Sequence, residues 1–231
     1  MLEGLAQDEF EVYSTRNDAR LRQMLAKFND SIIFVCTSEG IGNFEWEEWI
    51  RGVAGGKENS GVDIGIVAST ADESVMRKYL ENPRIRCGLT LLNADSAVII
   101  NRLTGFLNGV NAKGRRKYIR LLFDGDADAS VNFPMYGTYV NAAIKDISAA
   151  GFSCSFRDDP ELAKDSTFKD MQIRLQNQII RADGMIFGSR IDGSEKCYVV
   201  LFDQQIDPDV KTRIRQNIQA IMQKIMDDEL K

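Results

Sequence analysis

Two short groups of polar residues in the second half of the sequence have the types and spacing to do chemistry. Arg116 and Arg120 are four residues apart, Arg115 directly precedes them, and with Lys113 and Lys117 they place five cations within eight residues. Guanidinium groups can bind phosphate through paired hydrogen bonds and can stack on planar rings. The segment is therefore a candidate anion site, or alternatively a solvated linker.

The second group consists of Asp146, Ser148 and Gly151, which form an Asp-x-Ser-x-x-Gly pattern. Its position at the end of an expected strand allows an ordinary turn, in which Asp and Ser side chains bind nearby backbone amides. The pattern is uncommon by residue frequency alone, and its occurrence after the arginine pair is rarer still. Together the two groups indicate one binding site.

The elements around these groups are short segments rich in β-branched and aromatic residues, with no helix between them. Turn signals separate them, among them Asp-Gly and the Asn-Phe-Pro at 132–134. A helix is expected from Asp207-Pro208 to about Asp228. The pattern predicts an antiparallel barrel or sandwich followed by this helix. The six expected strands are 119–123, 136–147, 151–156, 168–175, 178–187 and 197–202.

Residues 114–231 resemble a PilZ domain, the bacterial receptor module for cyclic di-GMP. The resemblance is carried by Arg116-x-x-x-Arg120, by Asp146-x-Ser148-x-x-Gly151, by the strands that follow and by the last helix. It implies a six-stranded antiparallel β-barrel with a closing C-terminal helix. It also implies cyclic di-GMP as the ligand, with no other cofactor, no metal ion and no catalytic residue.

Each residue of the motif suits this ligand. Arg115, Arg116 and Arg120 could grip the phosphates or the guanine O6/N7 edge, and a third guanidinium would suit a stacked pair of ligand molecules as well as a single one. Asp146 could accept hydrogen bonds from guanine N1–H and N2–H, and Ser148 could reach a phosphate or a base edge. Gly151 would leave room for the backbone beneath the ligand.

The first half, residues 1–113, alternates strands and helices. Strands are expected over 32–36, 62–68 and 85–92, and helices over 15–28, 45–53, 72–80 and 96–107. Strand followed by helix three times predicts a small parallel sheet, because parallel neighbours need crossovers of about this length. We therefore expect two domains, an α/β domain over 1–113 and a barrel over 114–231.

The α/β half looks like a shortened receiver or Rossmann-like unit, but it lacks the chemistry of either. The strand ends at 36–38 and 68–70 carry no acidic cluster for phosphorylation. Gly40-Ile41-Gly42 resembles the start of a dinucleotide loop, but Glu45 occupies the third glycine position. Gly56-Lys57 is not a phosphate loop, because Glu58 follows where Ser or Thr is required. No site is predicted in this half.

Composition narrows the class of protein further. The chain has 44% hydrophobic residues, a formal net charge of −5 and no histidine, so the common serine and cysteine triads and the commonest metal ligand are absent. The four widely separated cysteines predict buried, reduced thiols. No apolar run is long enough for a membrane span and no secretory signal is evident, so we expect a cytoplasmic protein that does not bind nucleic acid.

We therefore expect a cyclic di-GMP receptor or effector, not an enzyme, in which ligand changes the arrangement of the two domains to control a bacterial process such as motility or surface behaviour. The N-terminal domain would contact a protein partner. The apolar stripe of the last helix, which includes Ile214, Ile218 and Ile225, is expected to pack on its own barrel, although its distal part could pair with a second copy. The alternatives are a PilZ-like scaffold that binds no ligand, and an enzyme that uses the N-terminal domain.

Overall fold

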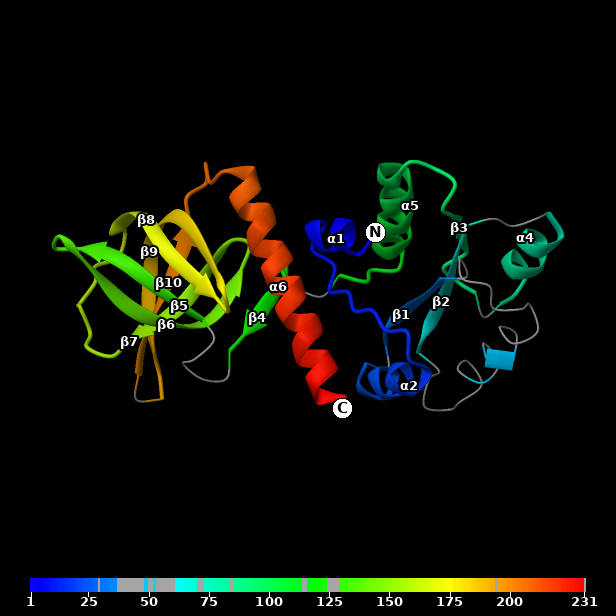
Figure 1. Cartoon of the computed structure of the whole chain (residues 1–231), viewed down its shortest axis with the longest axis horizontal. Helices are drawn as coiled ribbons and strands as arrows, with labels where there is room; N and C mark the ends of the chain where they lie inside the picture. Colours follow the sequence, from blue (N-terminus) through cyan, green and yellow to red (C-terminus); the bar gives the residue numbers. More distant parts are fainter. Residues whose placement is uncertain are drawn as a thin grey trace. The chain divides into compact units, whose positions relative to one another are not determined.

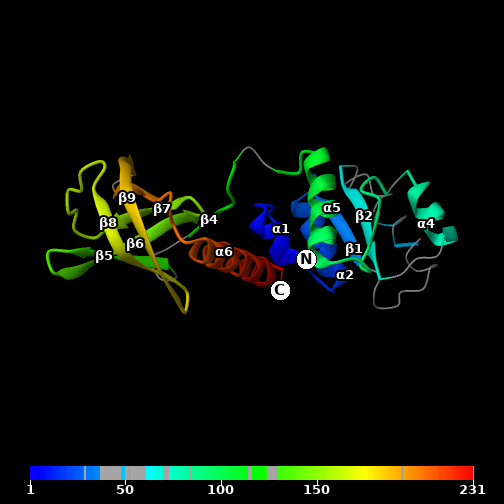
Figure 2. The same ribbon diagram turned by 90° about the horizontal axis from the view of Figure 1, so that it is seen from above.

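The chain forms two compact units in a computed structural model, Met1–Arg115 with Met226–Lys231, and Arg116–Ile225. Figure 1 and Figure 2 show the elements of both units in two views. Among the described residues, no helix is both long enough and apolar enough to cross a membrane. The structure describes residues 1–28, 30–36, 48–49, 52, 61–69, 73–83, 85–113, 116–123, 129–193 and 195–230.

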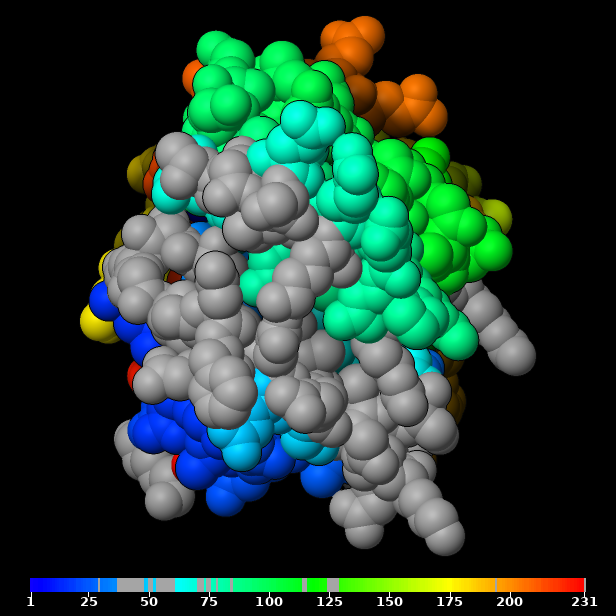
Figure 3. Space-filling model, turned by 90° about the vertical axis from the view of Figure 1, so that its right-hand side faces the viewer, coloured from blue at the N-terminus to red at the C-terminus, as the bar shows by residue number. Residues whose placement is uncertain are grey.

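The first unit contains a three-stranded parallel sheet, as the alternating pattern predicts. Its strands are β1 (Ile32–Cys36), β2 (Asp63–Ala68) and β3 (Leu89–Leu91), in the order β1-β2-β3. Part of the surface of this unit, including that of the segment 73–80, is seen in Figure 3. The helices are α1 (Leu2–Gln7), α2 (Asp18–Lys27), α4 (Glu73–Leu80) and α5 (Ser96–Gly109).

The central strand β2 is covered on both faces, which explains its continuous apolar sequence. Ile66 belongs to an apolar cluster with Leu25 of α2. Its neighbour Val67 points to the other face and belongs to a cluster with Leu103 of α5 and Leu5 of α1. Successive side chains of a strand alternate between faces, so two separate helical layers can pack on one strand.

Several sequence expectations for this unit need correction. The strand expected over 85–92 is reduced to β3, because the chain turns before it, with Gly88 at φ 68°. Helix α1 was not expected. Cys36 is exposed at the end of β1 rather than buried, while the other three cysteines lie in the interior as expected. The helix expected over 45–53 lies largely outside the described residues, as do Gly40-Ile41-Gly42 and Gly56-Lys57.

The second unit is a closed antiparallel barrel, so the expected fold class is confirmed. Six strands pair in the ring β6-β5-β8-β9-β10-β7, and the pairing of β7 with β6 closes it. A seventh strand, β4, pairs with β6 alone. The strands are β4 (Arg120–Leu122), β5 (Ala129–Met135), β6 (Thr138–Ser148), β7 (Gly151–Phe156), β8 (Thr167–Leu175), β9 (Gln178–Asp192) and β10 (Glu195–Phe202), and helix α6 (Pro208–Glu229) follows them.

The barrel differs from the expectation in one strand. Residues 119–123 were expected within the six, but β4 lies outside the ring, and the sixth strand is β5, which contains the supposed turn at Pro134. Proline cannot donate a ladder hydrogen bond, so it is tolerated only where one side of a strand is unpaired. β5 pairs with β8 only over Ala129–Asn132, so Pro134 lies in the stretch that pairs with β6 alone.

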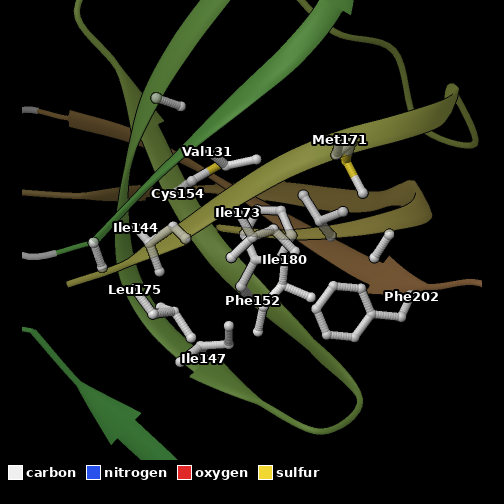
Figure 4. Packing of buried hydrophobic residues seen from close by; sticks show 14 of the residues in the cluster. Val131, Ile144, Ile147, Phe152, Cys154, Met171, Ile173, Leu175, Ile180 and Phe202 are labelled. Carbon is white, nitrogen blue, oxygen red and sulfur yellow. The ribbon is translucent and has the colours of Figure 1, made fainter. Parts of the chain in front are cut away.

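The barrel interior is filled by aliphatic and aromatic side chains from all six strands, as the close view in Figure 4 shows. Phe133 is fully buried and its ring lies 5.0 Å from that of Phe168 between centroids. Ile214 and Ile218 of α6 belong to the same apolar cluster, so this helix packs on its own barrel as expected. Burial of this kind stabilises the unit by about 25 cal/mol for each Å² of apolar surface.

A polar contact fastens the loop after β7 to the barrel wall. Tyr198 of β10 donates a hydrogen bond to Asp159, and Lys196 donates another at 2.9 Å. The Tyr198 hydroxyl also accepts the backbone N–H of Leu162 at 3.2 Å. The hydrogen bond from Tyr198, followed by that from Lys196, lowers the pKa of Asp159 to about 2.

This contact predicts an acid-dependent contribution to barrel stability. A carboxyl group whose pKa is lowered by folding stabilises the fold above its unfolded pKa, near 4, and loses that contribution as the pH falls towards about 2. Asp159→Ala should therefore lower the thermal unfolding midpoint at pH 7, and the difference from wild type should narrow between pH 4 and pH 2. Asp158→Ala, one residue away and also exposed, is the control. A difference that stays constant over this range would contradict the assignment.

Candidate ligand-binding site

Strand β6 brings the two polar groups of the sequence together. One edge of its C-terminal end pairs with β4, which sets Arg120 opposite Ser148 and Leu122 opposite Asp146. Its other edge pairs with β7, which sets Ser148 opposite Gly151. Arg120 is therefore next to the Asp-x-Ser-x-x-Gly hairpin, as a single site requires.

A β-bulge in β6 determines to which face of the barrel wall the Asp146 side chain points. The register of β6 against β7 shifts between Ile144 and Asp146, so Lys145 is an extra residue in the ladder. Ile144 and Ile147 are both fully buried in the barrel core although they are three residues apart. Because the bulge shifts the inward–outward alternation by one residue after Lys145, Asp146 lies on the outer face of the barrel wall.

The Asp146 carboxylate has a partner on each neighbouring strand. Its Oδ1 lies 3.5 Å from Nε of Arg120 on β4, and its Oδ2 accepts a hydrogen bond of 2.5 Å from Ser153 on β7. The side chain of Asp146 is only 10% exposed, whereas that of Arg120 is 39% exposed. The carboxylate is thus held between a buried hydroxyl and a more accessible cation.

Ser148 has a local role in the β6–β7 turn. Its hydroxyl donates to the carbonyl oxygen of Gly151 at 3.2 Å and accepts the backbone N–H of Ala150 at 3.3 Å. This is the turn chemistry that the sequence allowed as an alternative to ligand binding. The remaining lone pair of the hydroxyl is the group that a ligand could still use.

Gly151 is required by backbone packing between two strands. A Cβ atom at this position would lie 2.1 Å from the carbonyl oxygen of Val200 on β10. Since β7 pairs with β10 at this point, the backbone oxygen cannot move aside easily. The glycine therefore permits the close approach that closes the barrel next to the site, which is a role that the motif alone did not indicate.

Arg116 is exposed, and no hydrogen bond or ion pair joins it to another described residue. The chain between it and Arg120 is held by Tyr118, whose ring lies 5.3 Å from Nζ of Lys117 and 5.7 Å from Nζ of Lys211 on α6. The contact with Lys211 joins the arginine segment to the first turn of α6. Arg115, the third expected ligand, lies outside the described residues.

Sequence reasoning missed two residues that contact this region, Lys211 beside Tyr118 and Ser153 beside Asp146. Lys211 gave no signal, because a lone lysine near a helix start is common. Ser153 is the second residue after Gly151, and strand alternation could have placed it on the same outer face, but its pairing with Asp146 depends on the bulge. Among the described residues, no group of three or more Cys, Asp or Glu side chains could hold a metal ion.

Comparisons with known proteins match the C-terminal half of the chain to PilZ domains of solved structure. No family model matches the sequence, and no curated protein matches it. The PilZ domain of Escherichia coli YcgR, solved with c-di-GMP, is 14% identical, with a TM-score of 0.43 over 50% of this chain and 98% of that one.

Two further proteins match over about half of their own length. The Bacillus subtilis inhibitor of motility MotI/DgrA is 17% identical, with a TM-score of 0.39 over 49% of this chain and 52% of that one. K. pneumonia MrkH in complex with c-di-GMP is 18% identical, with a TM-score of 0.42 over 51% and 55%. All three matches have TM-scores below 0.5 and sequence identities below 20%, so they assign no ligand or function to this chain.

The close approach at Gly151 predicts a strong effect of a single methyl group. Gly151→Ala should destabilise the barrel by about 3 kcal/mol, because a side chain forced against a backbone oxygen must displace a strand. Chemical denaturation of the full chain measures this. Gly188→Ala on β9 is the control, because a Cβ there meets nothing within 4 Å. Equal stability of the two variants would contradict the packing role.

Proposed function

We propose that the chain is a cyclic di-GMP receptor, and that the ligand binds on the outer face of the barrel where β4, β6 and β7 meet. The observation that supports this best is the meeting of the two polar groups. Arg120 and Asp146 come from separate parts of the sequence, yet their side chains lie 3.5 Å apart beside Ser148. The site residues in this proposal are Arg115, Arg116, Arg120, Asp146, Ser148 and Gly151.

The chemistry of these side chains matches that of the ligand. Cyclic di-GMP offers two phosphates, which guanidinium groups bind through paired hydrogen bonds, and two guanines. Guanine presents N1–H and N2–H as neighbouring donors, which one carboxylate can accept together. With Arg116, Lys117, Arg120 and Lys211 in this region and Asp146 as the carboxylate between β4 and β7, the local charge suits a dianion.

Ligand binding would require Arg120 to leave Asp146 at least in part. The separation of 3.5 Å is long for a charge-assisted hydrogen bond, and the arginine side chain is 39% exposed. A phosphate offers the exposed guanidinium paired hydrogen bonds in exchange, and donors on the base can take its place at the carboxylate, so the ligand can compete for the arginine. Arg120 is then the group that exchanges an internal carboxylate for the ligand.

Arg116 gives the receptor a means to respond. It is the first residue of the second unit and has an exposed side chain, so ligand that it binds would order the chain at the boundary of the two units. The ordering would change the arrangement of the domains. In this proposal the N-terminal unit contacts a protein partner and carries the output to a bacterial process such as motility.

A ligand-independent scaffold is the second candidate function. It is favoured by one observation, namely that Ser148 and Asp146 already have partners within the barrel. Under this reading the motif maintains the fold and no ligand is needed. Calorimetric titration of the full chain with cyclic di-GMP separates the two functions, because only the receptor releases heat that saturates with ligand.

The receptor proposal predicts that each arginine is needed for binding. Arg116→Ala and Arg120→Ala should each weaken binding of cyclic di-GMP by about 30- to 1000-fold, because a charge-assisted contact worth about 2–4 kcal/mol is lost. Arg116→Lys should recover only part of the affinity, because a lysine cannot form paired hydrogen bonds. Isothermal titration calorimetry measures all three variants.

The matched control for the arginines is Arg157→Ala, which removes an exposed guanidinium at the end of β7 farthest from Gly151. It should bind as wild type does. Thermal unfolding of the Arg116 and Arg157 variants should remain close to that of wild type, whereas Arg120→Ala should unfold at a lower temperature, because it leaves the Asp146 carboxylate with Ser153 alone. Wild-type affinity in both Arg116→Ala and Arg120→Ala would overturn the site.

Hydrogen exchange tests the response at the unit boundary. Leu121 is paired with Ile147 in the β4–β6 ladder, so its amide should respond little to ligand. Exchange of the Arg116 and Lys117 amides should slow on addition of cyclic di-GMP. Unchanged exchange at both amides with saturating ligand would mean that the signal leaves the barrel by another route.

A further inference from the structure

Ser153 lies outside the polar pattern of the sequence, yet it makes the closest polar contact to Asp146. Its hydroxyl donates to Oδ2 of Asp146 at 2.5 Å, and the residue is 2% exposed. The two residues face each other directly across the β6–β7 ladder. Burial, a hydrogen bond and strand register therefore all restrict the position of this hydroxyl.

The two partners of the Asp146 carboxylate differ in how easily they can leave it. Arg120 is more exposed and lies at 3.5 Å, so another anion can draw it away. Ser153 has no comparable access to solvent, and moving its hydroxyl would leave a buried donor unpaired. The contact of Asp146 with Arg120 can therefore be exchanged for a ligand, whereas its hydrogen bond with Ser153 is retained.

We propose that Ser153 is a positioning residue that fixes the Asp146 carboxylate for recognition of guanine, an inference that rests on the proposed function of the site. When phosphate draws Arg120 away, the hydrogen bond from Ser153 keeps Oδ2 in place. Each carboxylate oxygen then retains a lone pair directed outward for a base donor. The specificity for guanine depends in this way on a side chain that does not touch the ligand.

The bulge at Lys145 makes this arrangement possible. Without the extra residue, regular alternation after Ile144 would direct Asp146 towards the core, opposite a core position of β7. With it, Asp146 and Ser153 become direct neighbours on the outer face. The contact between Asp146 and Ser153 thus depends on the register of β6 against β7 and not on the conformation of a loop.

The test compares recognition of two ligands that differ in a single donor. Cyclic di-GMP and its inosine analogue are titrated into the full chain, since hypoxanthine keeps N1–H but lacks the exocyclic N2 amine. Wild type should prefer the guanine ligand. Ser153→Ala should reduce this preference about five- to tenfold, the effect of one misaligned hydrogen bond, while the contacts with phosphate remain.

Ser155→Ala is the matched control. Ser155 lies two residues further along β7, is 7% exposed, and is paired in register with Ala143 rather than with Asp146. It should retain the preference of wild type, and its thermal unfolding should show the cost of removing a buried hydroxyl from this strand. Ser153→Thr, which keeps the hydroxyl, should restore the preference lost in Ser153→Ala.

A double-mutant cycle with Asp146→Ala separates positioning from a merely structural role. If Ser153 acts through the carboxylate, Ser153→Ala should change the guanine preference no further once Asp146 is alanine. Equal preference in Ser153→Ala and wild type, or an additive loss in the double variant, would overturn this inference while the proposed function stands. Failure of wild type to bind cyclic di-GMP would overturn the proposed function, and the inference with it.

Discussion

A negative charge on the outer wall of the barrel is the constraint around which the site is built. The Asp146 side chain is 10% exposed, and burial of a carboxylate without partners costs several kcal/mol. Each neighbouring strand supplies a partner for the carboxylate: β7 supplies the hydroxyl of Ser153, and β4 supplies the guanidinium of Arg120. The short strand β4, which lies outside the ring of six, places the arginine beside the carboxylate.

Much of the fold could be predicted from the sequence because local patterns determine it. Strand β1 was placed at its observed bounds, since a buried parallel strand is a continuous apolar run. β5 was missed because Pro134 is a turn signal in a local pattern, and only the pairing shows that this end of the strand has a free edge. The strand expected over 85–92 is longer than the observed β3, Leu89–Leu91. Ile85 and Cys87 are apolar and buried, as in a strand, but they lie in a turn that includes Gly88 at φ 68°.

The site was only partly predictable, for a related reason. Arg120, Asp146, Ser148 and Gly151 belong to motifs, and the structure brings these four together. Ser153 enters through strand register, which the bulge at Lys145 shifts by one residue. A bulge has no reliable signature in one sequence, because it depends on how two strands pair. The position of the motif could therefore be predicted from the sequence, whereas the hydrogen bonds that orient the Asp146 carboxylate could not.

Burial also gives the proposed site a way to reject wrong ligands. In the proposed complex the phosphates take Arg120, and Asp146 then depends on Ser153 and on the base itself for hydrogen bonds. Guanine replaces the lost partner with two donors, whereas adenine has no N1–H and would leave a largely buried carboxylate oxygen unpaired. A site that hydrogen-bonds its ligand discriminates strongly against analogues that lack the donor, because its own polar groups are then left unsatisfied. In the proposed complex, the carboxylate that Ser153 and Arg120 neutralise in the empty site would thus be the group that selects guanine.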